Sequence, residues 1–356
     1  MRRARFTAAL AALWSASAAA GGLPAPVAVD AAAASGAEPV ALGARLPEGD
    51  AAAEHWDLAA HFTSGHRLYA RFLITNAGPG ERTALAFGHL LRPDGAPIEF
   101  RNGRRAGSWK LSPDRRRIAI GSSVLELGDS AHHFEVDNDK RNIEILLDFP
   151  ADAGARAAPA APGGYRLALL NLATPARGRI LVGGMDAPRT LEGHALLTHT
   201  WFSREESKLV AQRSDVASLD PQARIFLSEL RGPAGARWRW LVAGDAAFTE
   251  AADGLVFEAT GPRGSAYPIP TALELRGNGL EGRVSLGATL LEVDPLAALP
   301  ALLRMVYPFA GKPRHVWVEA SAEVALKSPS RDAALRLRGE GIATLVFLDS
   351  RPPDPR

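Results

Sequence analysis

The 356-residue chain predicts an all-β fold built from two antiparallel domains. Three observations lead to this prediction. Apolar and polar residues alternate with a period close to two over most of the chain after residue 50, and clusters of Gly, Pro, Asn and Asp separate the alternating runs. The helices that a parallel sheet would need between its strands are missing. The architecture is therefore a barrel or a sandwich.

The expected strands follow one another along the chain as alternating runs. The first clear ones are residues 67–75, 116–127 and 141–149. Further runs are 165–172, 192–201, 208–213, 224–231, 237–242, 255–259, 271–276, 283–292, 315–326 and 334–347. We place the domain boundary at residue 188, so that the first β domain covers 49–188 and the second covers 189–350. Each half then holds about eight strands, enough to close a small barrel around one ligand.

One segment, residues 295–307, predicts a helix. Its leucines and Val306 fall on one helical stripe, and Asp294 followed by Pro295 supplies an N-cap and a first-turn proline. Pro300 opposes this interpretation, because an interior proline kinks a helix or delays its start.

The N-terminus resembles an export signal. Residues 1–20 combine a basic start with a short run of small apolar residues, and this is typical of a secretory signal peptide. Residues 21–48, rich in Ala and Pro, predict a disordered tether. We therefore expect a periplasmic or secreted protein.

Composition excludes several classes of site and partner. The chain has no cysteine, which excludes disulfides, a thiol nucleophile and Cys-ligated metals. It has 41 basic and 39 acidic residues, and Arg2, Arg3 and Arg5 lie in the leader; without them the balance is 38 to 39. A nucleic-acid partner therefore has no electrostatic basis.

Two sequence patterns could be taken for cofactor or metal sites. Residues 277–282 match G-x-G-x-x-G, but an expected strand follows them where a dinucleotide site needs a helix, so we predict a hairpin turn. His194 and His199 are five residues apart, and an odd spacing on a strand directs side chains to opposite faces. We expect neither a cofactor nor a metal.

The informative spacing is histidine two residues before tryptophan. His199 shares a strand face with Trp201, and His315 shares one with Trp317. If these faces line a barrel interior, they form an apolar cavity holding a few polar groups, which is typical of a ligand pocket. The alternative, a packed core in which each histidine has a backbone partner, stays equally open for the second half.

Three short motifs resemble the family of AttH proteins and hydroxyneurosporene synthases (carotenoid 1,2-hydratases). They are residues 54–56 (Glu-His-Trp), the order of strands through 108–149, and residues 193–201, which end in His-Thr-Trp. The resemblance covers about residues 50–350. It implies two lipocalin-like antiparallel β-barrel domains that bind apolar ligands. Where the family typically has Asp before the histidine, this chain has Thr198, so the resemblance supports the fold more than the reaction.

These observations favour an exported lipocalin-like protein that binds a hydrophobic small molecule, a lipid or an isoprenoid, without catalysis. A hydratase or isomerase acting on an isoprenoid is the alternative, and a carbohydrate-binding protein with exposed Trp240 and Trp317 is a third hypothesis. The expected ligand-binding residues are His199, Trp201, His315 and Trp317 in one cavity of the second domain, with Glu54 and Trp56 near its mouth. Peripheral membrane contact and the oligomeric state stay open.

Overall fold

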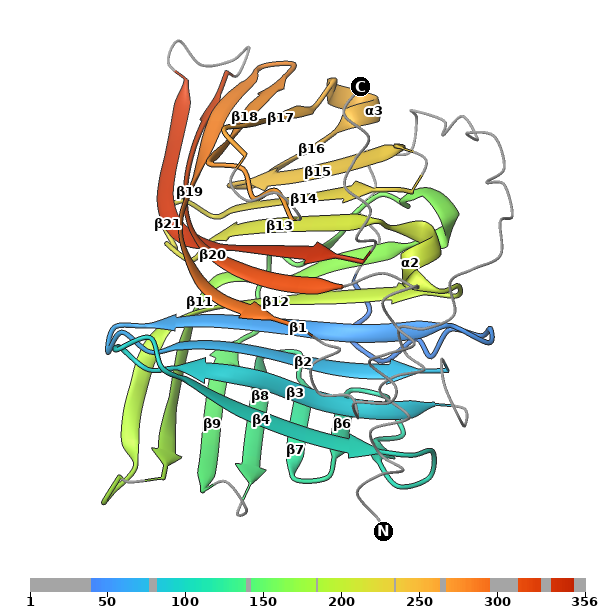
Figure 1. Ribbon diagram of the computed structural model, residues 1–356, viewed down its shortest axis with the longest axis vertical. Coiled ribbons are helices and arrows are strands. Elements are labelled where there is room, and N and C mark those ends of the chain that lie inside the picture. The colour runs from blue at the N-terminus through green and yellow to red at the C-terminus, as the bar shows by residue number, and fades with distance from the viewer. Residues whose placement is uncertain are drawn as a thin grey trace. The chain divides into compact units, whose positions relative to one another are not determined.

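The computed structural model describes residues 40–76, 82–138, 142–183, 185–233, 235–262, 267–294, 313–327 and 334–348. These residues form two compact units. One unit contains residues 40–160 and 164–205, and the other contains 161–163 and 206–348. Each unit is built on one curled antiparallel sheet (Figure 1), so the predicted all-β class is confirmed.

The first unit holds a sheet of 12 strands, in the order β4-β3-β2-β1-β12-β11-β9-β8-β7-β6-β5, with β10 paired to β11. The strands are β1 (Ala53–Phe62), β2 (Arg67–Thr75), β3 (Thr83–Leu91), β4 (Pro97–Arg104), β5 (Lys110–Leu111), β6 (Arg117–Ile120), β7 (Ser123–Leu127), β8 (Ala131–Asn138), β9 (Ile143–Pro150), β10 (Arg156–Ala157), β11 (Arg166–Val182) and β12 (Arg189–Phe202). A short 3₁₀ turn, η3 (Pro162–Gly164), precedes β11.

Aromatic rings from distant strands meet on the concave face of this sheet. The ring of Phe134 on β8 lies 6.1 Å from that of Phe72 on β2 and 6.4 Å from that of Phe100 on β4. All three side chains are fully buried. Because inward residues recur at every second position of each strand, the alternation of the sequence supplies this core directly.

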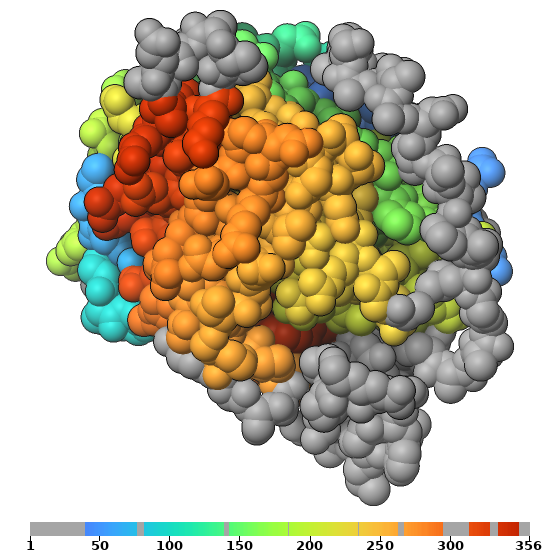
Figure 2. Space-filling model, turned by 90° about the horizontal axis from the view of Figure 1, so that it is seen from above, coloured from blue at the N-terminus to red at the C-terminus, as the bar shows by residue number. Residues whose placement is uncertain are grey.

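The second unit holds a sheet of 9 strands, in the order β16-β15-β14-β13-β21-β20-β19-β18-β17. Its elements are α2 (Glu206–Leu209), β13 (Gln212–Ser218), β14 (Ile225–Arg231), β15 (Arg237–Ala243), β16 (Ala246–Thr249), α3 (Glu250–Asp253), β17 (Val256–Thr260), β18 (Ala272–Gly277), β19 (Leu280–Val293), β20 (Arg314–Leu326) and β21 (Leu335–Phe347). This sheet also curls, since Arg239 of β15 lies 5.9 Å above the ring of Phe257 on β17. Figure 2 shows the yellow and orange parts of the chain side by side on one face.

The division between the units falls after Glu205 rather than at residue 188. We expected the second domain to begin with the strand that is now β12, but β12 pairs with β1 along its whole length, from Ala53 opposite Phe202 to Phe62 opposite Gly193. Its inward residues, among them Leu197, belong to the first core. Long-range pairing with β1 therefore decides which sheet receives β12.

Two local expectations are corrected and one is confirmed. Residues 116–127 form the hairpin β6–β7 rather than one strand, because Gly121 takes a positive φ of 64° at the turn. Residues 40–48, which we expected in a disordered tether, include the buried Ala44 and pack on the first core. Residues 277–282 do form a hairpin, with Gly277 opposite Leu280.

The expected helix at 295–307, the leader at 1–20 and most of the tether lie outside the described residues. Among the residues that are described, no helix has the length and apolar character needed to cross a membrane.

Candidate functional site

The pairing of β1 with β12 brings four of the six expected site residues together. Trp56 lies opposite His199 and Glu54 lies opposite Trp201 in the ladder. Even-numbered residues of β1 and odd-numbered residues of β12 face the first core, so all four side chains point to the concave face. We call these four residues the Glu54–His199 cluster.

A buried carboxylate and a buried imidazole form the centre of this cluster. Nε2 of His199 lies 2.6 Å from Oε1 of Glu54, and both side chains are 0% exposed. The ring of Trp56 stacks on His199 at 4.5 Å with an interplanar angle of 11°, and the ring of Trp201 lies 4.7 Å away on a tilt of 38°. Two indoles thus shield the pair from water.

The segment before β1 completes the coordination of the carboxylate. The backbone N–H of Arg45 donates to Oε1 of Glu54 at 2.6 Å, and that of Leu46 donates to Oε2 at 2.8 Å. The guanidinium of Arg45 lies 5.3 Å above the ring of Trp201. Glu54 therefore anchors the entering chain and orients His199 at the same time.

His199 is a neutral base in this setting. Burial lowers its pKa; the hydrogen bond with Glu54 and its charge offset this in part, and the Arg45 guanidinium lowers the pKa further. Because Nε2 donates to the carboxylate, Nδ1 carries the lone pair. Nδ1 is buried and has no hydrogen-bond partner among the described residues, and the same holds for the indole N–H of Trp56. The cluster thus presents one free acceptor and one free donor.

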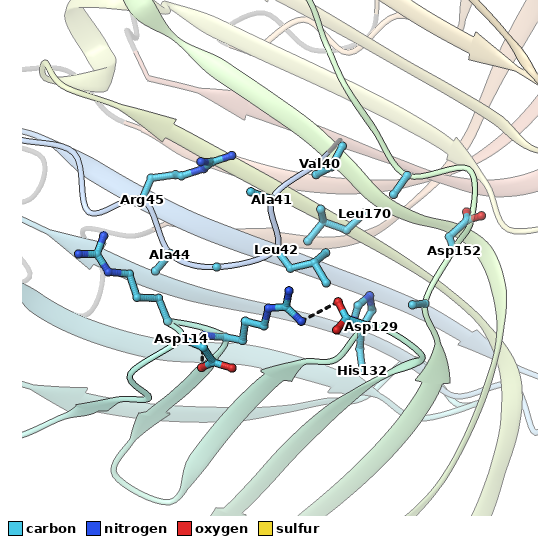
Figure 3. Close-up of a pocket in the computed structure, with 15 residues that line it drawn as sticks. Val40, Ala41, Leu42, Ala44, Arg45, Asp114, Asp129, His132, Asp152 and Leu170 are labelled. Carbon is cyan, nitrogen blue, oxygen red and sulfur yellow. Dashed lines mark hydrogen bonds and ion pairs between the residues drawn. The ribbon is translucent and has the colours of Figure 1, made fainter. Parts of the chain in front are cut away.

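A pocket of about 740 Å³ adjoins the cluster in the same unit. Ala44 and Arg45 form part of its wall, so the segment that holds Glu54 is common to the pocket and the cluster. Figure 3 shows residues 40–45 crossing the pocket, with Leu170 on one side and His132 and Asp129 on another. A volume in this range suits a small organic ligand.

His315 and Trp317 belong to the other unit. Both lie on β20 in the sheet of the second unit, where they are 2% exposed. Val316 and Val318 face the core of that sheet, so His315 and Trp317 point to its other face. The expectation that both His-x-Trp pairs belong to the second domain was therefore wrong: strand parity holds within each pair, but the pairs belong to different sheets. Whether any of the six binds a ligand stays a prediction.

Sequence reasoning missed His132 and Arg116 of the pocket and the backbone groups that hold Glu54. The signal for His132 was present, because it shares strand parity with Phe134 and Val136, both fully buried. No comparable signal exists for the backbone N–H groups of Arg45 and Leu46. They come to Glu54 through the path of a segment that has no repeating pattern.

Buried histidines predict an acid-sensitive fold. Burial, with a smaller effect of Arg67, lowers the pKa of His61 on β1 to about 4 from 6.5. Below pH 6.5 the unfolded chain therefore binds a proton that the folded chain refuses, so the free energy of unfolding should fall as the pH drops from 6.5 to 4. For His61 alone the loss is about 3 kcal/mol.

Urea denaturation of the wild type and of His61→Phe at several pH values tests this expectation. The variant should show a flatter pH dependence than the wild type over that range. Equal slopes for the wild type and His61→Phe would contradict it.

Comparisons with known proteins identify the fold. No protein-family model and no curated protein matches the sequence. Among solved structures, the chain is similar to an AttH-like protein from Nitrosomonas europaea, with a TM-score of 0.62 and 16% identity over 88% of this chain and 98% of that one. It is also similar to kievitone hydratase from Nectria haematococca, with a TM-score of 0.51 and 12% identity over 85% of this chain and 91% of that one. A third similar structure is CghA with Sch210972, with a TM-score of 0.58 and 12% identity over 88% of this chain and 96% of that one.

Proposed function

Because this chain has the two-domain lipocalin-like fold of the AttH-like protein, kievitone hydratase and CghA, we propose that it is an enzyme rather than a passive carrier. We propose that it either adds water to a carbon–carbon double bond or moves such a bond along the chain of its substrate. The substrate is a hydrophobic small molecule such as an isoprenoid. Identities of 12–16% support the fold alone, so the reaction is argued from the Glu54–His199 cluster.

The observation that carries the proposal is the buried His199–Glu54 pair with a free Nδ1. In hydration, Nδ1 accepts a proton from water while the water oxygen bonds to one carbon of a polarised double bond. The imidazolium then returns the proton to the other carbon, so that one water is added across the bond. Isomerisation needs the same nitrogen, which takes a proton from a carbon beside a carbonyl and returns it further along the chain. Glu54 stabilises the imidazolium in both cases.

The surroundings of the pair suit an apolar substrate. Trp56 and Trp201 supply flat apolar walls, and the free indole N–H of Trp56 can donate to a carbonyl oxygen that polarises the double bond. Since Glu54 and His199 are fully buried, turnover requires the segment carrying Arg45 and Leu46 to move aside and open the cluster to the pocket.

Thr198, at the position where the resembled family typically has Asp, does not weaken the proposal. Thr198 lies between the inward residues Leu197 and His199, and its even number directs it to the opposite face of β12. The carboxyl group available to the cluster is Glu54, which lies on β1.

We further propose that the leader-like residues 1–20 direct the protein out of the cytoplasm.

Mass spectrometry in heavy-oxygen water tests the proposed reaction. Purified protein is incubated with citral and pseudoionone, which have polarised double bonds, with farnesene, which has none, and with the organic extract of freshly purified protein. We expect heavy oxygen in a hydrated product, or a shifted isomer with deuterium when deuterated water is used, from polarised substrates only. Recovery of every compound bound but unchanged would overturn the enzyme proposal in favour of a binding protein.

A further inference from the structure

The segment that leads into β1 crosses the pocket (Figure 3). We call residues 40–46 the strap. Its even-numbered side chains pack on the first core, and its exposed side chains are odd-numbered. The inward side chains are Val40, Leu42, Ala44 and Leu46, and the exposed ones are Ala41 and Arg45. The strap therefore lies over the pocket with one apolar side turned toward the core.

The strap is not a strand of the sheet, although its side chains alternate like those of a strand. No described residue pairs with it in a ladder. Its backbone hydrogen bonds lie at one end only: the N–H of Ala44 donates to the carbonyl of Arg115 at 2.9 Å, and the next two N–H groups donate to the carboxylate of Glu54. Residues 40–43 make no hydrogen bond to any other residue that the structure describes. A segment held in this way opens at a lower free energy than the sheet around it.

Apolar burial is what holds residues 40–42 in place. Val40 and Leu42 pack against the first core, and both line the pocket together with the fully buried Leu170 of β11. Burial of apolar surface is not directional, so another apolar molecule can replace these side chains without loss of a specific bond. The strap thus occupies apolar space that a ligand would fill in its place.

The path of the strap indicates which class of ligand suits this space. The strap bends at Gly43, where a Cβ atom would lie 3.0 Å from the carbonyl oxygen of Asp114. The space that it occupies is therefore narrow and curved. A flexible, acyclic apolar chain can follow such a path, whereas a compact ring system with the same number of carbon atoms cannot.

We propose that the strap is a built-in competitor of the ligand: it fills the apolar part of the binding site, and a flexible apolar chain such as an acyclic isoprenoid binds by displacing it. This inference deepens the proposed function and rests on it for the view that displacement opens the Glu54–His199 cluster to a substrate. The displacement itself requires no turnover.

Displacement links the affinity for the ligand to the hold on the strap with a definite sign. When only the open form binds, the apparent Kd is the intrinsic Kd divided by the open fraction. A substitution that weakens the hold on the strap raises the open fraction and lowers the apparent Kd. If the strap were instead a fixed wall of the pocket, loss of an apolar wall side chain would raise the Kd. The two interpretations predict opposite changes.

Calorimetric binding of farnesene to the wild type and to Leu42→Ser tests this sign. Leu42→Ser should bind farnesene about tenfold more tightly, because the burial of half a leucine side chain corresponds to about 1.4 kcal/mol. Ala41→Ser is the matched control, since Ala41 is the exposed neighbour on the same segment, and its Kd should equal that of the wild type. Cedrene, a compact tricyclic isomer of farnesene, should bind the wild type more weakly than farnesene does.

Trypsin cleavage of the wild type gives a second measurement that needs no variant. Saturating farnesene should speed cleavage after Arg45 about tenfold or more, because the bound ligand keeps the strap open. Cleavage after Arg213, which is buried on β13, reports global unfolding and should not change. A ligand that binds beneath a fixed wall would slow cleavage after Arg45.

Four results would overturn the proposal: equal or weaker binding of farnesene by Leu42→Ser, no binding by either protein, cedrene bound as tightly as farnesene, or cleavage after Arg45 that farnesene does not speed. Failure of this proposal and of the proposed function are distinguishable. Tighter binding in Leu42→Ser with no product from any substrate would refute the reaction alone. A hydrated product from the wild type with unchanged binding in Leu42→Ser would refute displacement alone.

Discussion

Replacing His199 by Phe should lower kcat by about 10²–10⁴-fold for the substrate that the heavy-oxygen experiment identifies. This is the range for loss of a general acid–base group. Phe has similar size and can still stack on Trp56, and the backbone N–H groups of Arg45 and Leu46 still donate to Glu54. The variant should therefore lose some stability but stay folded and continue to bind. The effect should therefore appear in kcat, with little change in KM. Steady-state kinetics of the wild type and the variant measure this split directly.

The matched control for this substitution is His194→Phe. His194 lies on the same strand, β12, but an odd number of residues away, and its side chain points to the other face. The rate of this variant should stay close to that of the wild type. Glu54→Gln should fall between the two, because the amide can still accept from Nε2 but no longer stabilises an imidazolium. Unchanged kcat in His199→Phe would remove His199 from the reaction and leave Glu54 as a structural anchor only.

Replacing Glu54 by Leu should lower the free energy of unfolding by about 3–5 kcal/mol, because three hydrogen bonds to one buried carboxylate are lost and each hydrogen bond to a charged group contributes about 1.5–3 kcal/mol. The substitution leaves the backbone N–H groups of Arg45 and Leu46 and the Nε2 of His199 without their acceptor. Guanidinium denaturation measures the loss. The released segment should also become accessible to trypsin, which cleaves after Arg45.

Glu126→Leu serves as the control for this measurement. Glu126 pairs with Arg117 at 3.2 Å, but both side chains are about half exposed, and such a surface pair contributes about 0–1 kcal/mol. A loss in Glu54→Leu no larger than that in Glu126→Leu would show that the carboxylate does not hold the segment. Trypsin cleavage of Glu54→Leu at Arg45 at the wild-type rate would also show that the carboxylate does not hold the segment.

The sequence alone was sufficient for most properties that depend on neighbouring residues, although it did not predict the Gly121 turn that divides 116–127 into two strands. Strand β2 covers residues 67–75 as the alternation predicts, and the Gly277–Gly282 motif forms the expected hairpin. Parity also placed His199 and Trp201 on one face, and likewise His315 and Trp317. The physical reason is that side-chain direction along a strand repeats every two residues, whatever the strand pairs with.

The tertiary structure alone decided which strands meet. Glu54 and His199 are separated by 145 positions, and their contact depends on the register of β1 against β12. No local pattern encodes that register, so the sequence assigned β12 to the wrong domain and grouped Trp201 with Trp317 in the second domain. The pocket wall that contains His132 likewise depends on the path of residues 40–46 and on the irregular pairing of β11 at Asn171. Long-range pairing is selected by the burial of whole sheet faces, which is a property of the complete fold and not of any segment.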